Sequence, residues 1–158
     1  MLGALEVEDV GIPTEADWGQ YATDLDQESA HQIFAGKSIQ DVLPLFRANV
    51  LERASELSFM PSVPFRYYVL AFKEYVLSGV ALEDECDAAD AANSFLNLVD
   101  SRLHDDPQSI APVIGELLPA VGFVAMHQET YHAPVSIYGT FTSRLGRITE
   151  AAGRLTTR

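Results

Sequence analysis

Two copies of the spacing Glu-x-x-His occur in the sequence, and no other pattern in it points as specifically to chemistry. Glu28 precedes His31 by three residues, and Glu129 precedes His132 by three. Residues three apart share one face of a helix, and two such motifs with two further carboxylates bind di-iron or di-manganese in ferritin-like bundles. A di-metal enzyme is therefore one hypothesis, with a metal ion as the one cofactor that the sequence suggests.

The expected helical phase separates the two motifs. At about 100° per residue, the apolar stripe that begins at Trp18 points away from His31, so the first motif should face solvent. If the helix before it continues past Pro119, His132 falls on the same stripe as Leu117, and the second motif is the better metal candidate. The alternative, which we favour, is that these residues are structural or solvated.

Other reactive residue types lack the neighbours that they need. His127 and His132 are five apart, which does not place them on one helical face, and no cysteine accompanies them as a zinc ligand. Cys86 is the single cysteine, so it cannot form an internal disulfide, and no histidine is paired with it locally. No phosphate loop, dinucleotide fingerprint or nucleophile elbow occurs. These absences favour a protein that is not an enzyme.

The charge of the chain restricts its partners. The 158 residues include 23 Asp and Glu against 10 Lys and Arg, a formal net charge of -13. Nucleic acid and anionic membrane surfaces would be repelled, so we expect neither as a partner. A basic protein would be attracted by long-range steering. The N-terminus lacks the basic and apolar regions of a signal peptide, so we expect a cytoplasmic protein.

Two acidic segments are candidates for contact with a basic partner. The first holds Asp24, Asp26 and Glu28, and the second holds Glu83, Asp84, Asp87 and Asp90. The alternative is that both are ordinary solvated faces. The leading hypothesis is a small acidic interaction protein without catalytic activity. An inhibitor or immunity-type protein that masks the basic surface of a toxin or nuclease is its concrete form.

Aromatic residues suggest a further alternative, the binding of a small apolar ligand. Tyr67, Tyr68, Tyr75 and Phe123 are the candidates for lining a pocket between helices. Helical bundles host such pockets. The competing interpretation is that the aromatic side chains simply form the core.

All these residues must be positioned by helices, because apolar residues recur at helical spacing. The strongest example is Phe65, Val69, Phe72 and Val76, which recur at four, three and four residues. Leu70 and Leu77 add a second apolar line, and a helix that is apolar on two faces is buried on both sides. We therefore expect a central buried helix at about 64–78 that ends at Gly79.

No alternating apolar and polar run predicts a strand, so the expected fold is all-α. We expect residues 1–13 to form an extended N-terminal arm and residues 14–158 to form one domain, a bundle of six or seven helices. The expected first helix covers about 14–36. Pro44 should shorten the second helix, and Pro119 should kink a helix that runs from about 107 to 132.

The last helix carries an apolar seam over residues 138–155. Its members, spaced by three and four residues, are Tyr138, Phe141, Leu145, Ile148, Ala152 and Leu155. Such a seam packs against a neighbouring helix, either within the chain or in a second copy. The sequence thus predicts a monomer or a weak homodimer through 138–155, and the size of the domain favours the monomer.

Overall fold

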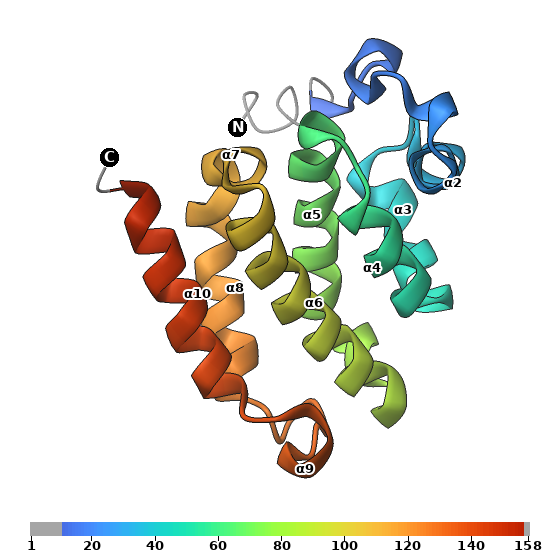
Figure 1. The fold of residues 1–158 in the computed structure, drawn as a ribbon. Coiled ribbons are helices and arrows are strands. Elements are labelled where there is room, and N and C mark those ends of the chain that lie inside the picture. Colours follow the sequence, from blue (N-terminus) through green and yellow to red (C-terminus); the bar gives the residue numbers. More distant parts are fainter. Residues whose placement is uncertain (1–10, 157–158) are drawn as a thin grey trace, which may run out of the picture.

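The computed structural model describes residues 11–156, and every regular element in that range is a helix. This confirms the predicted all-α bundle (Figure 1). The α-helices are α2 (Leu25–Phe34), α3 (Ile39–Ala48), α4 (Val50–Ser58), α5 (Ser62–Val76), α6 (Glu85–Asp105), α7 (Pro107–Ile110), α8 (Ile114–Met126), α9 (Val135–Tyr138) and α10 (Phe141–Thr156). Short 3-10 turns are η1 (Glu15–Trp18), η2 (Tyr21–Thr23), η3 (Gly79–Leu82) and η4 (Ala111–Val113). Only α7 and α9, of four residues each, go beyond the expected six or seven helices.

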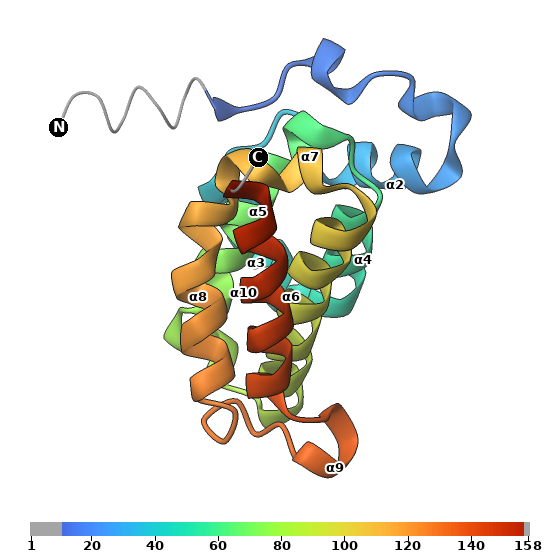
Figure 2. The ribbon, with the colours of Figure 1, turned by 60° about the vertical axis from the view of Figure 1, so that its left-hand side comes forward.

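Helix α5 is the buried axis of the bundle. It contacts α3, α4, α6, α7 and α8, and Figures 1 and 2 show it between these neighbours. Phe65, Tyr68 and Phe72 are fully buried, as the two apolar faces of this helix predict. The helix ends before Leu77, whose own conformation is still right-handed. The expected left-handed cap at Gly79 is not formed, and Gly79 begins η3 instead.

The segment before α2 is not the continuous helix that was expected over 14–36. The Thr14 backbone N–H donates to the Asp17 carboxylate at 2.8 Å, which fixes the first 3-10 turn. Gly19 then adopts a φ of 62°, a left-handed conformation that ends this turn. Asp24 starts α2 by accepting two backbone N–H groups. These local side-chain bonds outcompete the continuation of one helix. Residues 1–10 of the predicted arm lie outside the described range.

The expected helix over 107–132 is divided into α7, η4 and α8. Pro112 lies at the start of η4 and removes a backbone N–H, so the α-helical pattern is interrupted there. Pro119 lies inside α8 on its exposed side, and the helix continues through it. The helix ends at Met126, so Glu129 and His132 are not on it. The helical phase expected for the second Glu-x-x-His motif is therefore wrong.

The seam of the last helix packs within the chain. Helix α10 contacts α6 and α8, and Figure 2 shows it between them. Phe141 and Ile148 are fully buried, and Ala152 is nearly so. The apolar positions of 138–155 are therefore engaged with the chain's own helices.

Arg102 is buried and joins α6 to the corner between α4 and α5. Its guanidinium donates to the carbonyl oxygens of Leu57, Ser58 and Met60 at 3.2, 3.3 and 2.6 Å, and to the Ser109 hydroxyl at 3.0 Å. Leu57 and Ser58 form the last residues of α4, and Met60 lies in the corner that follows. The Leu57 carbonyl also accepts the Met60 backbone N–H at 3.2 Å, so Arg102 adds a second donor there and supplies donors to Ser58 and Met60, at a helix end where carbonyls lack intrahelical partners.

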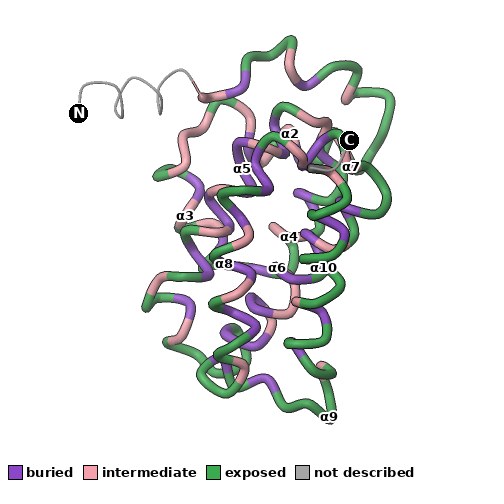
Figure 3. The backbone as a smooth tube through the Cα atoms, turned by 90° about the vertical axis from the view of Figure 1, so that its left-hand side faces the viewer, coloured by how far each residue is buried: buried purple, intermediate pink, exposed green. Residues whose placement is uncertain are grey.

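One helical stretch, Pro107–Met126, is long and apolar enough to cross a membrane by length and composition alone. The core helix of a bundle passes the same test. Here α8 contacts α5, α6 and α10, and buried and exposed positions alternate along it (Figure 3).

Candidate functional site

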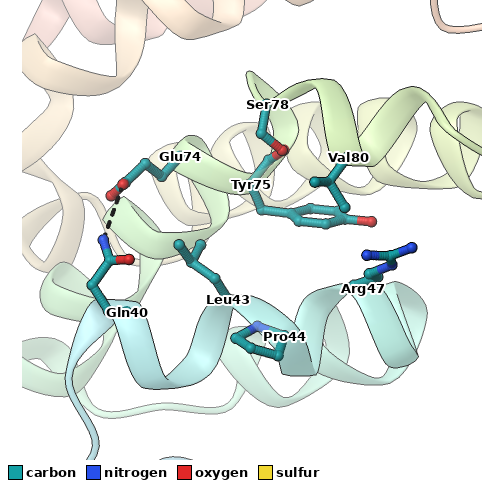
Figure 4. Close-up of a pocket in the computed structure, with 8 residues that line it drawn as sticks. All are labelled: Gln40, Leu43, Pro44, Arg47, Glu74, Tyr75, Ser78 and Val80. Atoms are coloured by element: carbon teal, nitrogen blue, oxygen red, sulfur yellow. Dashed lines mark hydrogen bonds between the residues drawn. The ribbon is translucent and has the colours of Figure 1, made fainter.

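A groove of about 400 Å³ lies between α3 and the end of α5 (Figure 4). Its lining residues come from α3, α5 and the turn after α5: Gln40, Leu43, Pro44, Arg47, Glu74, Tyr75, Ser78 and Val80. A second hollow of about 300 Å³ continues it toward the start of α6 and shares Arg47, Tyr75 and Val80 with it. We call the two together the α3/α5 groove.

The α3 wall of the groove follows from local sequence. The Ser38 hydroxyl and the Asp41 carboxylate each accept the other residue's backbone N–H, and this capping box starts α3. Gln40, Pro44 and Arg47 then lie on one face of the helix, since they are four and three residues apart. Pro44 has no N–H to donate to the carbonyl of Gln40, so a backbone acceptor is left without its helical partner beside the groove.

Tyr75 forms the floor between the two halves of the groove. Its ring packs against Phe46 with centroids 5.9 Å apart, and the whole residue is only 4% exposed. Burial raises the pKa of the phenol, with further contributions from Asp87 and Glu83, while Arg47 opposes the shift. Tyr75 is therefore a neutral hydroxyl at physiological pH.

Two polar pairs cross the groove. The Arg47 guanidinium donates to the Glu83 carboxylate at 2.8 Å, and the side-chain amide of Gln40 donates to Glu74 at 3.4 Å. The Arg47 and Glu83 side chains are 63% and 55% exposed, so water screens their attraction. Both pairs are consequently weak enough to be exchanged for other partners.

The end of the groove near α6 is acidic. Glu83, Asp84 and Asp87 line it, and Asp84 caps α6 by accepting the Asp87 backbone N–H at 3.0 Å. The amide dipoles at a helix start favour negative charge beside them. With Glu74 in the neighbouring half, four carboxylates and one guanidinium border the groove. The groove therefore suits a ligand that carries positive charge.

The acidic residues predicted to contact a partner lie in separate places in the structure. Glu83, Asp84 and Asp87 border the groove, whereas Asp90 lies one turn further along α6 and accepts a hydrogen bond from the Tyr138 hydroxyl at 3.3 Å. The other segment (Asp24, Asp26 and Glu28) lies on α2, far from the start of α6 in both Figures 1 and 2. The two acidic segments do not form one surface.

The four predicted pocket aromatics are not brought together. Only Tyr75 lines the groove. The Tyr68 hydroxyl is buried within hydrogen-bond distance of the carbonyls of Phe34 and Lys37, and burial raises its pKa. Tyr67 is buried and its hydroxyl accepts the Ile39 backbone N–H at 3.2 Å.

Phe123, the fourth predicted pocket residue, lies on α8 and is 44% exposed. Its ring stacks on His127 with centroids 4.1 Å apart. It therefore packs on its own helix and lines none of the hollows described around Tyr75.

The two Glu-x-x-His motifs lie at opposite ends of the molecule (Figures 1 and 2). His31 contacts Glu15 at 2.9 Å, and Glu28 is exposed beside it. His132 is exposed with a φ of 56°, in the turns after α8, and Glu129 is exposed as well. Within residues 11–156, no group of three or more His, Cys, Asp or Glu side chains is placed to hold a metal ion.

Sequence reasoning missed several groove residues, above all Arg47. Gln40, Pro44 and Arg47 recur at helical spacing on a face that has no continuous apolar stripe. Such a face is typical of a helix side that is not covered by a neighbouring helix, and this pattern could have indicated the groove. Cys86, which has no histidine near it in the sequence, is exposed and free near the start of α6 and lines neither hollow of the groove.

Comparison with known proteins found no match: no family model, no curated protein and no solved structure is significantly similar to this chain. Inference about function therefore starts from the groove itself.

Proposed function

We propose that the protein binds a basic protein partner through the α3/α5 groove, without catalysing a reaction. The observation that supports this is the charge of the groove, whose border has four carboxylates and one cation, Arg47. Masking the basic surface of a toxin or nuclease, as an inhibitor or immunity-type protein does, is the form of this function that we favour.

Electrostatics make such an association fast. The net charge of -13 attracts a basic protein over roughly one Debye length, about 8 Å at physiological salt. Steering of this kind raises association rates and depends strongly on salt. The apolar side chains of Leu43, Pro44 and Val80 beside the carboxylates add contact area that salt does not weaken. The groove thus combines attraction at a distance with apolar contact at close range.

The proposal is tested by site-specific photo-crosslinking in cells of the source organism. A benzoylphenylalanine at Val80, which is 37% exposed in the groove, should crosslink a basic protein that mass spectrometry then identifies. The same probe at Leu25, which is 83% exposed beside the other acidic segment, serves as the control. We expect the crosslink from Val80 and none from Leu25.

A charge variant makes the test specific to the groove. Glu83→Gln, Asp84→Asn and Asp87→Asn together remove three charges, and asparagine keeps the cap at position 84. The crosslink from Val80 should disappear in this variant. Crosslinks to acidic or neutral proteins, or crosslinks that survive the triple variant, would contradict the proposal.

A further inference from the structure

We infer that the α3/α5 groove recognises an arginine side chain of the partner, and that Arg47 occupies the place of this arginine until the partner arrives. The inference rests on the proposed function and names the residue type that the groove reads. It follows from the state of three groups: the Tyr75 hydroxyl, the Arg47 guanidinium and the carboxylates near α6.

The Tyr75 hydroxyl is built into the groove but has no partner there. The residue is 96% buried, and its hydroxyl forms no hydrogen bond with another described residue. Figure 4 shows the hydroxyl pointing along the groove toward the Arg47 guanidinium. The ring is buried, but the oxygen lies open to the groove and is not one of the buried side-chain atoms without a partner, which are Trp18 Nε1 and Asp100 Oδ1 among the described residues. A ligand with N–H donors would satisfy this oxygen.

The guanidinium of Arg47 already lies in the groove. It has five N–H donors but, within residues 11–156, makes one hydrogen bond, to Glu83 at 2.8 Å. Asp84 and Asp87 border the same hollow. An incoming arginine therefore competes with Arg47 for Glu83 and finds further acceptors around it. Because both side chains of the resident pair are exposed, the displaced Arg47 is readily hydrated.

The shape of the site favours arginine over lysine. The acceptors come from different sides, namely Tyr75 from α5, Glu83 from the following turn and Asp87 from α6. A planar guanidinium presents several donors in fixed directions, whereas an ammonium is a compact point charge. Leu43, Pro44 and Val80 provide an apolar wall for the aliphatic stem of the side chain.

The test is titration of the labelled full-length protein with synthetic peptides, followed by NMR. The probe is a capped heptapeptide, Gly-Ser-Leu-Arg-Leu-Ser-Gly, compared with versions in which lysine or uncharged citrulline replaces the arginine. We expect the arginine peptide to shift the groove resonances and to bind about tenfold more tightly than the citrulline peptide. Binding should also alter the side-chain Nε–H resonance of Arg47 as it leaves Glu83.

Two arginine variants form the decisive comparison. Arg47→Ala removes the competitor and should tighten binding of the arginine peptide by about two- to fivefold. Arg147→Ala removes an equally exposed arginine, paired with Asp100 at 2.8 Å on the α10 side of the bundle, and should leave the affinity within about twofold. The pair separates local competition from a general change in charge. Glu83→Gln should weaken the peptide about tenfold.

Several results would overturn the inference. These are no binding of the arginine peptide up to its solubility limit, equal affinity for the lysine peptide, or weaker binding by Arg47→Ala. Groove shifts caused by spermidine but by no peptide would point to a polyamine site instead. If any of these occurs while the triple carboxylate variant still loses the Val80 crosslink, the partner is basic but is not read through an arginine.

Discussion

His31 and Tyr21 lie face to face, with ring centroids 3.7 Å apart and planes 8° apart. Both side chains donate to the Glu15 carboxylate, Tyr21 at 2.7 Å and His31 at 2.9 Å. One carboxylate therefore holds η1, η2 and α2 together. The edge of His31 also faces the buried ring of Trp18 at 5.2 Å. His31 thus joins the N-terminal turns to the bundle, whereas Glu28 of the same Glu-x-x-His motif takes no part in these contacts.

Glu15 should make the N-terminal turns sensitive to acid. The hydrogen bonds from His31 and then Tyr21 hold its pKa below the ordinary value of 4.5. A carboxyl group whose pKa is lowered by folding stabilises the fold above that ordinary value, and this contribution is lost as the pH falls through the lowered pKa. Glu15→Gln should therefore destabilise the protein at pH 7, and the difference should shrink below about pH 4.5. Urea unfolding as a function of pH measures this.

The control for this prediction is Glu28→Gln. Its carboxylate is exposed on the same helix as His31 and makes no hydrogen bond within the described residues. Equal pH dependence of the two variants would show that the Glu15 contacts contribute nothing.

Replacing Arg102 should destabilise the fold strongly. Arg102→Met keeps an apolar side chain but removes the guanidinium, whose Cζ lies 4.0 Å from the Phe65 ring centroid, and leaves the buried Met60 carbonyl oxygen without its 2.6 Å donor. We expect a loss of about 3 kcal/mol in the free energy of unfolding. The matched variant Arg147→Met removes an exposed ion pair and should cost less than about 1 kcal/mol. Similar losses in chemical denaturation for both would refute the role given to Arg102.

Removal of the hydroxyl should destabilise the protein at one tyrosine, Tyr131, and have little effect at another, Tyr75. The Tyr131 hydroxyl donates to the Val76 carbonyl at 2.6 Å in the core, so Tyr131→Phe should cost about 1 kcal/mol. Tyr75→Phe removes a hydroxyl without a partner and should change stability by less than about 0.5 kcal/mol. Thermal and urea unfolding compare the two. A large cost for Tyr75→Phe would mean that its hydroxyl is already engaged.

Ionisation of Tyr131 offers an independent check of its burial. Burial raises the pKa of this phenol to about 12. In a spectrophotometric titration, Tyr131→Phe should remove a late step and leave the earlier steps unchanged. Loss of a step near the ordinary value of 10 would contradict the buried position.

Two glycines should give opposite results when replaced by alanine. Gly122 lies inside α8, and a Cβ there would meet nothing within 4 Å, so Gly122→Ala should stabilise by about 0.5–1 kcal/mol. Gly139 has a φ of 76° and a ψ of -177°, a conformation nearly confined to glycine. Gly139→Ala should cost about 2 kcal/mol. Changes of the same sign in the two unfolding curves would contradict the backbone conformation described for Gly139.

The sequence predicts the centre of this fold well, because that part depends on local periodicity. The stripe through Phe65 and Phe72 places α5 within two residues at each end. The predicted helix boundaries are wrong where a single local contact determines whether the helix continues. Gly19 and Asp24 divide the expected first helix, and Pro112 breaks the path before α8. Periodicity does not report such competition between a helix and a cap.

The groove is harder to predict because it arises from contacts between distant segments. Arg47 and Glu83 are 36 residues apart, and nothing in their local sequence pairs them. The same holds for Arg144 on α10, whose guanidinium reaches Asn93 and Asn97 across α6. Spacing can show that such residues share a helix face, but only the packing of helices shows what that face meets.

The contacts of Arg102 have a consequence for the order of folding. The carbonyl oxygens that it binds precede it by 42 to 45 residues. During synthesis, the corner between α4 and α5 leaves the ribosome long before the arginine that completes it. Until α6 has been made and docked, that corner lacks the Arg102 donors and the face of α5 that packs on α6 is uncovered, so we expect a nascent chain halted within α6 to bind chaperones.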